Sequence, residues 1–171
     1  MNRVLSLDPG DVMTGFCLID RDTLKPVEFG KIDNQELAKL MENELVFDEF
    51  VAERIASYGM PVGVTTFRTC EWIGRFVQIV VHKNAINGTH IPISYIYRKD
   101  EKLHICGDSR AKDANIRRSL IDRFATVDMK NGKGSKNRQD FFYGFKSDIW
   151  QSYSTGLTYI EAGPSEVEKS L

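Results

Sequence analysis

The sequence predicts a single α/β domain built on a mixed five-stranded sheet that is flanked by helices. Three short apolar runs near the start are joined by links that suit antiparallel hairpins. Two further strand-like runs each follow a helical pattern, and strand–helix–strand order favours parallel pairing. The length of 171 residues and the 42% apolar content fit one domain with a substantial core.

The first three strands are expected at Arg3 to Leu7, Gly15 to Asp20 and Pro26 to Ile32. Turn residues between positions 21 and 25 connect the second strand to the third. In the first link, Pro and Gly directly follow Asp8 and force the chain to turn. The Asp8 carboxylate is therefore expected at the end of the first strand, at the edge of the sheet.

The middle of the chain alternates between helix and strand. Asn34 is expected to cap a helix that runs to about residue 43. A short strand is expected from Phe47 to Arg54, and a long helix from Phe67 to about Asn87, where apolar residues recur at helical spacing. Pro92 to Tyr97 reads as the fifth strand.

The last third of the chain is predicted to be helical and basic. Lys112 to Phe124 forms an amphipathic helix, residues 128–140 form a mobile basic loop, and a final helix runs from Lys146 to about Ala162. The domain is thus expected to span residues 1–162, with a frayed tail at 163–171.

Charge and cysteine content narrow the class of partner. The chain has a net charge of −1, but residues 98–138 contain twelve Lys or Arg and six acidic residues, a net +6. Such a segment favours a polyanion on one side of the protein, although a solvated helix and loop remains the alternative. The three cysteines lack metal-ligand or disulfide spacing, and no apolar run could cross a membrane. We expect a cytoplasmic protein without a signal peptide or membrane contact.

Three acids occupy comparable positions in the expected elements. Asp8 ends the first strand, Glu53 ends the fourth, and Asp148 lies in the first turn of the last helix. Carboxylates gathered at one sheet edge repel each other unless cations lie among them, and hard oxygen ligands suit Mg²⁺ or Mn²⁺. Two such ions support phosphodiester cleavage. Taken singly, the acids also suit a turn, a surface ion pair with Arg54, or a favoured place at a helix start.

The motifs resemble the RuvC family of Holliday junction resolvases, which have the RNase H-like fold. The resemblance covers about residues 1–162. It rests on Leu5-Ser6-Leu7-Asp8-Pro9-Gly10 with Thr14-Gly15, on Ala52-Glu53-Arg54, and on Lys146-Ser147-Asp148-Ile149-Trp150. The details are similar to the bacteriophage branch of the family, which implies a bacterial host cell. The resemblance implies a metal-dependent endodeoxyribonuclease that resolves Holliday junctions and other branched DNA as a homodimer, without a small-molecule cofactor.

The resemblance also assigns roles to individual residues. Asp8, Glu53 and Asp148 are the implied catalytic ligands of two Mg²⁺ or Mn²⁺ ions. The family often carries a second acid three residues into the last helix, where this chain has Gln151, a possible additional ligand without charge. The aromatic wedge of the cellular enzymes is also missing, because Ala56 occupies its place. The nearest aromatic substitutes for contacting the junction are Tyr58 and Phe67.

Basic residues outside the carboxylate site are expected to contact the DNA backbone without reading bases. They are Arg110, Lys112, Arg117, Arg118, Lys130, Lys133, Lys136 and Arg138. The wide apolar arc of the long helix suits either a dimer contact or a fully buried core helix.

Two alternatives to junction cleavage remain open at this point. One is an RNase H-like nuclease that acts on RNA–DNA hybrids or replication forks. The other is a junction-binding protein that does not cleave. Gln151 favours this alternative, because it stands where the family often carries a second acid.

Overall fold

The computed structural model describes residues 2–56, 59, 61–127 and 130–165. Its main feature is a five-stranded sheet in the order β3-β2-β1-β4-β5. The strands are β1 (Arg3–Asp8), β2 (Met13–Asp20), β3 (Pro26–Asp33), β4 (Glu49–Arg54) and β5 (Ile93–Tyr97). The first three strands pair antiparallel, whereas β4 runs parallel to β1 and β5 runs parallel to β4. The predicted mixed sheet is confirmed.

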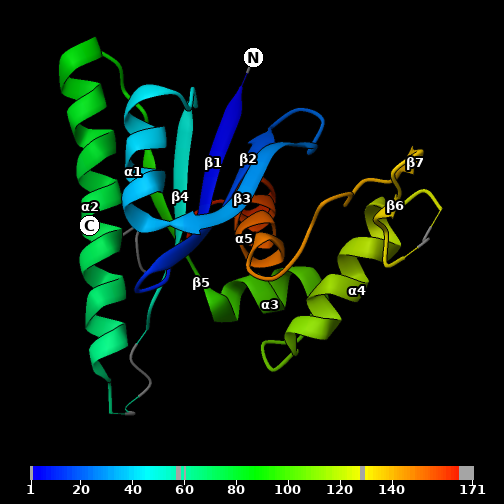
Figure 1. Cartoon of the computed structure of the whole chain (residues 1–171). Coiled ribbons are helices and arrows are strands. Elements are labelled where there is room, and N and C mark those ends of the chain that lie inside the picture. The colour runs from blue at the N-terminus through cyan, green and yellow to red at the C-terminus, as the bar shows by residue number, and fades with distance from the viewer. Residues whose placement is uncertain (1, 57–58, 60, 128–129, 166–171) are drawn as a thin grey trace.

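Two helices cover one face of the sheet (Figure 1). They are α1 (Asn34–Asn43) and α2 (Val64–Asn87). Leu5 and Leu7 of β1 point to this side and join a core with Phe50 of β4 and Phe76 of α2. Removing this apolar surface from water is the main stabilising contribution on this side of the sheet.

The start of α1 corrects one prediction. Asp33, not Asn34, is the N-cap, and its carboxylate accepts hydrogen bonds from the backbone N–H groups of Gln35 and Glu36 at 2.8 and 3.3 Å. Asn34 is buried inside the first turn of the helix. Its side chain instead forms hydrogen bonds with Thr14 and Gly10 at the β1–β2 turn.

The last helix, α5 (Ile149–Ala162), covers the opposite face of the sheet (Figure 1). It approaches β1 closely, because a Cβ on Gly156 would lie 2.8 Å from the Cβ of Ser6. Next to α5 lie α3 (Arg98–Cys106) and α4 (Asp113–Phe124). Their apolar side chains form a second core with Phe142, Phe145 and Tyr153.

Several boundaries differ from the sequence predictions. Helix α3 was not predicted, α2 starts three residues earlier than expected, and α5 starts three residues later than expected. The predicted mobile loop contains a short hairpin of β6 (Gly134–Ser135) and β7 (Arg138–Gln139). Asp140 fixes the end of this hairpin by accepting backbone N–H groups of Thr126, Val127 and Phe141.

The predicted frayed tail is held at its start. Ser165 is buried, and its backbone N–H donates to the carbonyl of Tyr95 in β5. Its hydroxyl accepts the backbone N–H of Tyr97 and contacts the Asp100 carboxylate. Residues 166–171 lie outside the described part of the chain, so for them fraying stays a prediction.

Candidate metal site and nucleic-acid interface

The strand registers place four residues in one row across the sheet. Asp8 pairs with Gly15 across β1 and β2, and Gly15 pairs with Lys31 across β2 and β3. The parallel register of β1 and β4 puts Glu53 beside Asp8 at the ends of the two strands. Because cross-strand partners point to the same face of a sheet, the row Glu53, Asp8, Gly15, Lys31 faces α5.

Asp148 lies above the gap in this row. It occupies the N-cap position of α5, one residue before the helix, rather than its first turn as predicted. A Cβ on Gly15 would lie 2.7 Å from the carbonyl oxygen of Asp148 and 3.0 Å from its Cβ. The absence of a side chain at Gly15 therefore lets the start of α5 reach the row. This contact gives the Thr14-Gly15 motif a structural reason.

The turn that follows Asp8 is fixed by a buried polar network. The hydroxyl of Thr14 donates to the side-chain oxygen of Asn34 at 2.6 Å, and the Asn34 amide donates to the carbonyl of Gly10 at 2.9 Å. The backbone N–H of Asn34 also bonds the carbonyl of Val12. These bonds hold the β1–β2 turn, and with it the end of β1, in one conformation.

Asp8 and Glu53 are carboxylates without enough counter-charge. Burial, followed by repulsion from Asp148, raises the pKa of Asp8 to about 7. Burial, followed by repulsion from Asp8, raises the pKa of Glu53 to about 8. A neighbouring divalent cation would favour the ionised form of both groups.

Asp148 differs from them because a lysine already neutralises it. Lys31 Nζ lies 2.6 Å from Asp148 Oδ2, and the Ser147 hydroxyl donates to Asp148 Oδ1 at 2.7 Å. Burial acts to raise the pKa of Asp148, but the hydrogen bonds from Lys31 and Ser147 outweigh it and leave the pKa below its ordinary value. Asp148 is thus ionised and paired.

Two charged residues of α3 belong to the site and were missed by the sequence analysis. Glu101 is fully buried against α5, where its carboxylate accepts the hydroxyls of Ser154 and Thr155. Arg98 bonds Glu101 at 2.6 Å and lies 3.7 Å from Glu53. Burial raises the pKa of Glu101, while Arg98 opposes that shift. One sequence signal pointed to Arg98 as part of the site: it directly follows the fifth strand, whose end lies beside the end of the fourth.

The donor set fits a divalent cation at the Asp8 and Glu53 end of the row. Both groups offer carboxylate oxygens, which Mg²⁺ and Mn²⁺ prefer, and the raised pKa values show that their ionised forms are disfavoured by burial and by neighbouring acids. Gln151 adds a buried side-chain oxygen that accepts no hydrogen bond from any described residue. Within the described ranges, however, no three Asp, Glu, His or Cys side chains form a ready-made metal cluster. The three predicted carboxylates share one face and edge, with Asp148 held by Lys31.

The predicted basic contacts surround α4 and its approach. Arg110 and Lys112 are exposed and line a hollow on one side of α4 together with Arg118. Arg117 lines a second hollow with Lys133 and with Trp150 of α5. The charge of Arg117 also contributes to lowering the pKa of Asp148, so the basic face of α4 adjoins the carboxylate site.

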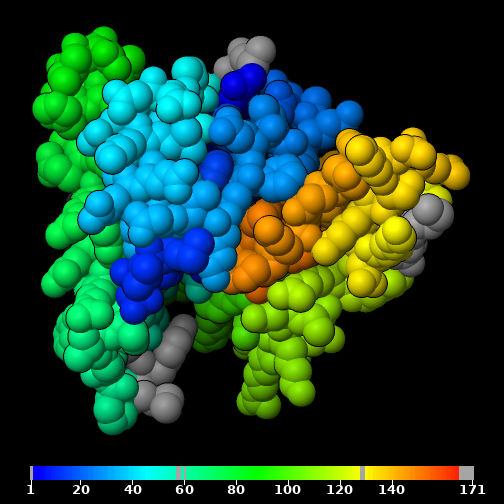
Figure 2. All heavy atoms as spheres, in the orientation of Figure 1, coloured from blue at the N-terminus to red at the C-terminus, as the bar shows by residue number. Residues whose placement is uncertain are grey.

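The remaining basic residues lie around the short hairpin. Lys130, Lys136 and Arg138 are exposed. Figure 2 shows this segment and α4 as one continuous edge of the molecule. The structure thus gathers the predicted basic residues on one side, next to the start of α5.

Of the two aromatic residues predicted to contact the junction, the structure describes Phe67. Phe67 lies in the first turn of α2 and is 59% exposed. Helix α2 begins toward the end of the sheet where β1 and β4 finish (Figure 1), so Phe67 lies near the carboxylate end of the sheet, although α2 covers the face opposite to α5. Tyr58 lies outside the described residues.

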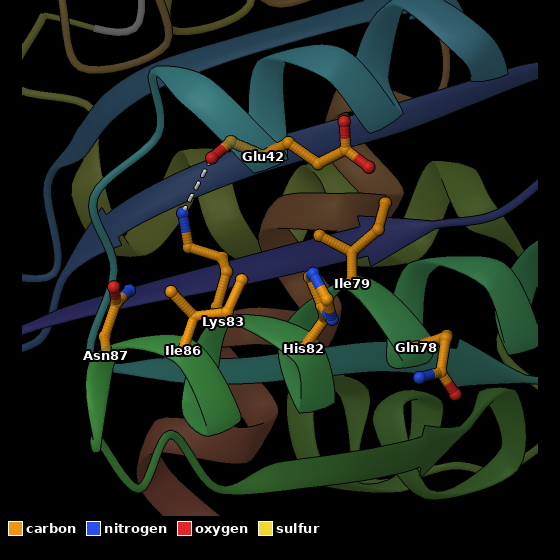
Figure 3. A pocket seen from close by; sticks show the side chains of 7 residues that line it. All are labelled: Glu42, Gln78, Ile79, His82, Lys83, Ile86 and Asn87. Carbon is orange, nitrogen blue, oxygen red and sulfur yellow. Dashed lines mark hydrogen bonds between the residues drawn. The ribbon is translucent and has the colours of Figure 1, made fainter.

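A separate hollow between α1 and α2 is unrelated to the carboxylates. Figure 3 shows Lys83 of α2 reaching across it to the end of α1, where its ammonium donates to the carbonyls of Met41 and Glu42 at 3.0 and 3.3 Å. Lysine thereby binds carbonyls that a helix end leaves without partners. We assign this contact to helix packing.

Comparison with known proteins identifies the class of fold. No family model and no curated protein matches the sequence. Among solved structures, *Thermus thermophilus* RuvC in complex with a Holliday junction substrate matches with a TM-score of 0.59 and 11% identity, covering 95% of this chain and 97% of that one. A second structure of *Thermus thermophilus* RuvC gives 0.58 and 12%, covering 94% and 96%.

A eukaryotic structure gives the same result. The yeast mitochondrial Holliday junction resolvase Ydc2 matches with a TM-score of 0.61 and 12% identity, covering 93% of this chain and 79% of that one. The chain therefore has the fold of RuvC-type Holliday junction resolvases, and the predicted RNase H-like fold is confirmed. In the described part of the chain, no helix combines the length and apolar character needed to cross a bilayer.

Proposed function

We propose that this protein is a metal-dependent, structure-selective endodeoxyribonuclease that resolves Holliday junctions and other branched DNA. The observation that carries the proposal is the row of Glu53 and Asp8 at the ends of adjacent parallel strands, with Asp148 above it. The fold shared with the junction resolvases supports the same reading. We also propose that residues 1–162 form a single nuclease domain.

In the proposed reaction, Asp8, Glu53 and Asp148 hold Mg²⁺ or Mn²⁺, with two ions in the complete complex with DNA. When bound, the ions supply an activated water and stabilise the departing oxygen. The two paired strands fix the backbone positions of Asp8 and Glu53 at one edge of the sheet. The uncharged Gln151 contributes at most an amide oxygen.

The DNA backbone is proposed to lie along α4 and the hairpin. Arg117 connects this surface to the site, because it lines a hollow with Trp150, two residues after Asp148. Phosphate contacts from Arg110, Lys112 and Arg117 favour recognition of shape over sequence. Each lost contact should reduce the log–log salt dependence of binding by about 0.9. Phe67 is the described aromatic placed to contact unpaired bases.

A panel of labelled substrates tests the proposed function. The purified protein is incubated with four-way junctions, forks, RNA–DNA hybrids and linear duplex, in Mg²⁺, in Mn²⁺ and in EDTA. We expect paired cuts in four-way junctions with either ion, and intact DNA in EDTA. Preferential cutting of hybrids would replace junction resolution with an RNase H-like activity. Junction binding without cleavage in any divalent ion would contradict the nuclease proposal.

Two cuts across a four-way junction require two active sites, and we propose a two-fold homodimer. Helix α2 carries a stripe of exposed and half-buried residues, formed by Cys70, Gly74, Val77 and Val81, with steps of three and four residues. Nothing lies within 4 Å of a Cβ placed on Gly74, so that side of the helix is open. A heptad-spaced stripe with small residues suits close packing against a second helix.

Sedimentation velocity tests the dimer. Gly74→Glu should give a monomer without loss of folding, since a Cβ at this position meets no atom of the described residues within 4 Å. His82→Glu, which adds a carboxylate on the side of α2 nearer to α1, is the matched control and should remain dimeric. A monomeric wild-type protein in the presence of junction DNA would contradict the proposal, as would a dimeric Gly74→Glu variant.

A further inference from the structure

Lys31 has no assigned role in the proposed chemistry, yet it lies inside the carboxylate site. It comes from β3, the edge strand, and is the cross-strand partner of Gly15. Because Gly15 has no side chain, Lys31 and Asp8 flank an open position in the row. The backbone carbonyl and Cβ of Asp148 lie above this position, and its carboxylate contacts Lys31. The contact of 2.6 Å between Lys31 Nζ and Asp148 Oδ2 places an ammonium inside the site.

The charges of the site can be compared with those of the ions it is proposed to hold. Four carboxylates face one another across β1, β4, α3 and α5: Asp8, Glu53, Glu101 and Asp148. Two cations are in direct contact with them, Lys31 with Asp148 and Arg98 with both Glu101 and Glu53. With all six groups ionised, the site carries a net charge of −2. One divalent ion neutralises that charge, whereas two ions would leave an excess of +2 in a partly buried site.

Two exposed groups at the edge of the site, Asp113 and Arg117, carry opposite charges that cancel in this balance. Arg98 also bonds Asp113 at 2.6 Å, but the side chain of Asp113 is 54% exposed and screened by water. Gln151 stands where a further acid would have raised the charge to −3, and it contributes none. Glu53 lies 3.7 Å from Arg98, which bonds Glu101 more closely, whereas Asp148 already has Lys31 at 2.6 Å.

We propose that Lys31 is a positioning residue that occupies the place of a second cation, so that the DNA-free protein binds one divalent ion, between Asp8 and Glu53. This inference rests on the proposed metal-dependent function and concerns the same site. Lys31 holds the Asp148 carboxylate in place without metal, through the contact of 2.6 Å between Nζ and Oδ2. A second ion would be favoured only once the scissile phosphate adds negative charge to the site.

The inference is tested by counting bound Mn²⁺ ions without DNA. Calorimetric titration and the loss of free Mn²⁺ signal in electron paramagnetic resonance both report the number of sites independently of cleavage. We expect one site in the wild-type protein. Lys31→Met keeps the bulk of the side chain and removes its charge, and it should gain a second Mn²⁺ site or tighten the weaker one at least ten-fold. Lys31→Gln gives a second, polar variant should the methionine disturb folding.

Two controls locate the effect. Lys25→Met removes an exposed lysine that directly precedes β3, and it should leave one site. Adding Asp148→Asn to Lys31→Met should abolish the second site, because it removes the carboxylate that Lys31 had neutralised.

The outcomes separate the inference from the function on which it rests. Two equal sites in the wild-type protein, or unchanged number and affinity in both Lys31 variants, would overturn the role of Lys31 and leave the nuclease proposal intact. Absence of Mn²⁺ binding in the wild-type protein and the variants would overturn both.

Discussion

The two ends of the carboxylate site differ in how their charge is balanced. At the strand end, Asp8 and Glu53 are half-buried side by side. Burial with repulsion from Asp148 raises the pKa of Asp8 to about 7, and burial with repulsion from Asp8 raises the pKa of Glu53 to about 8. At the helix end, Asp148 is paired with Lys31 and its pKa is lowered. The difference shows that carboxylates of one site need not be equivalent: the strand end gains most from a divalent cation, and the helix end least.

The largest expected effect comes from removing the internal cation of the strand end. Arg98→Met leaves Glu101 fully buried without its cation and removes the positive charge near Glu53. Breaking such a buried pair costs about 3–5 kcal/mol in the free energy of unfolding. Urea denaturation measures this loss. Lys99→Met, on an exposed position of the same helix, is the matched control and should change stability by less than about 0.5 kcal/mol.

A second variant checks whether the loss is electrostatic. Adding Glu101→Gln to Arg98→Met removes the buried carboxylate charge that Arg98 no longer neutralises. The double variant should therefore recover part of the lost free energy of unfolding. If Arg98→Met costs no more than the Lys99 control, the strand end does not depend on its arginine and the comparison between the two ends fails.

A smaller effect is expected from moving the two ends apart. Gly15→Ala places a Cβ 2.7 Å from the Asp148 carbonyl, so the start of α5 must shift away from β2. Overpacking of this kind costs about 1–3 kcal/mol. Misplacement of Asp148 should lower junction cleavage about 10²-fold. Single-turnover assays measure the rate, and Gly63→Ala, where the nearest side-chain atom lies 4.0 Å away, is the control. A Gly15→Ala enzyme with wild-type cleavage would show that α5 need not approach the row.

The smallest effect is a pH dependence of stability that arises from Asp8 and Glu53 at the strand end. The folded pKa values of Asp8 and Glu53 lie above those of the unfolded chain, so the folded protein binds protons more tightly. Without metal, stability should therefore fall as pH rises from about 5 to 8, by at least about 1.4 kcal/mol. Thermal unfolding across this range measures the trend, and Mn²⁺ should reverse it most at pH 8. Asp8→Asn should flatten the profile; a metal-free protein that becomes more stable toward pH 8 would contradict the raised values.

The strand end was predictable from sequence because its signals are local. Alternating apolar residues located β1 and β4, and the turn residues after Asp8 fixed where β1 ends. In a parallel pair, residues at the ends of adjacent strands meet, so Asp8 and Glu53 could be placed together before the structure was considered. The same reasoning gave the mixed sheet.

The other charged residues of the site, Glu101 and Lys31, were not predictable in this way. Glu101 lies in the charged run Arg98-Lys99-Asp100-Glu101-Lys102, which reads as a solvated surface. Its burial depends on hydroxyls of Ser154 and Thr155 more than fifty residues later. The role of Lys31 depends on the register of β3 against β2, which hydrophobic alternation leaves open.

The start of α1 was misplaced for a related reason. Asp33 and Asn34 are both favoured N-cap residues, and nothing local decides between them. The structure assigns the cap to Asp33 because the Asn34 side chain bonds Thr14 and Gly10 in a turn twenty residues earlier.

The most direct test of the account is junction cleavage by Asp8→Asn, measured beside its binding to the same junction. The substitution keeps the shape of the side chain and removes the charge that two strands hold at the edge of the sheet. We expect cleavage in Mg²⁺ or Mn²⁺ to fall about 10³-fold or more, with junction affinity within about three-fold of wild type, since the proposed phosphate contacts lie elsewhere. Asp22→Asn, beyond the opposite end of β2, should cleave normally. An Asp8→Asn protein that cuts four-way junctions at the wild-type rate would contradict the central claim.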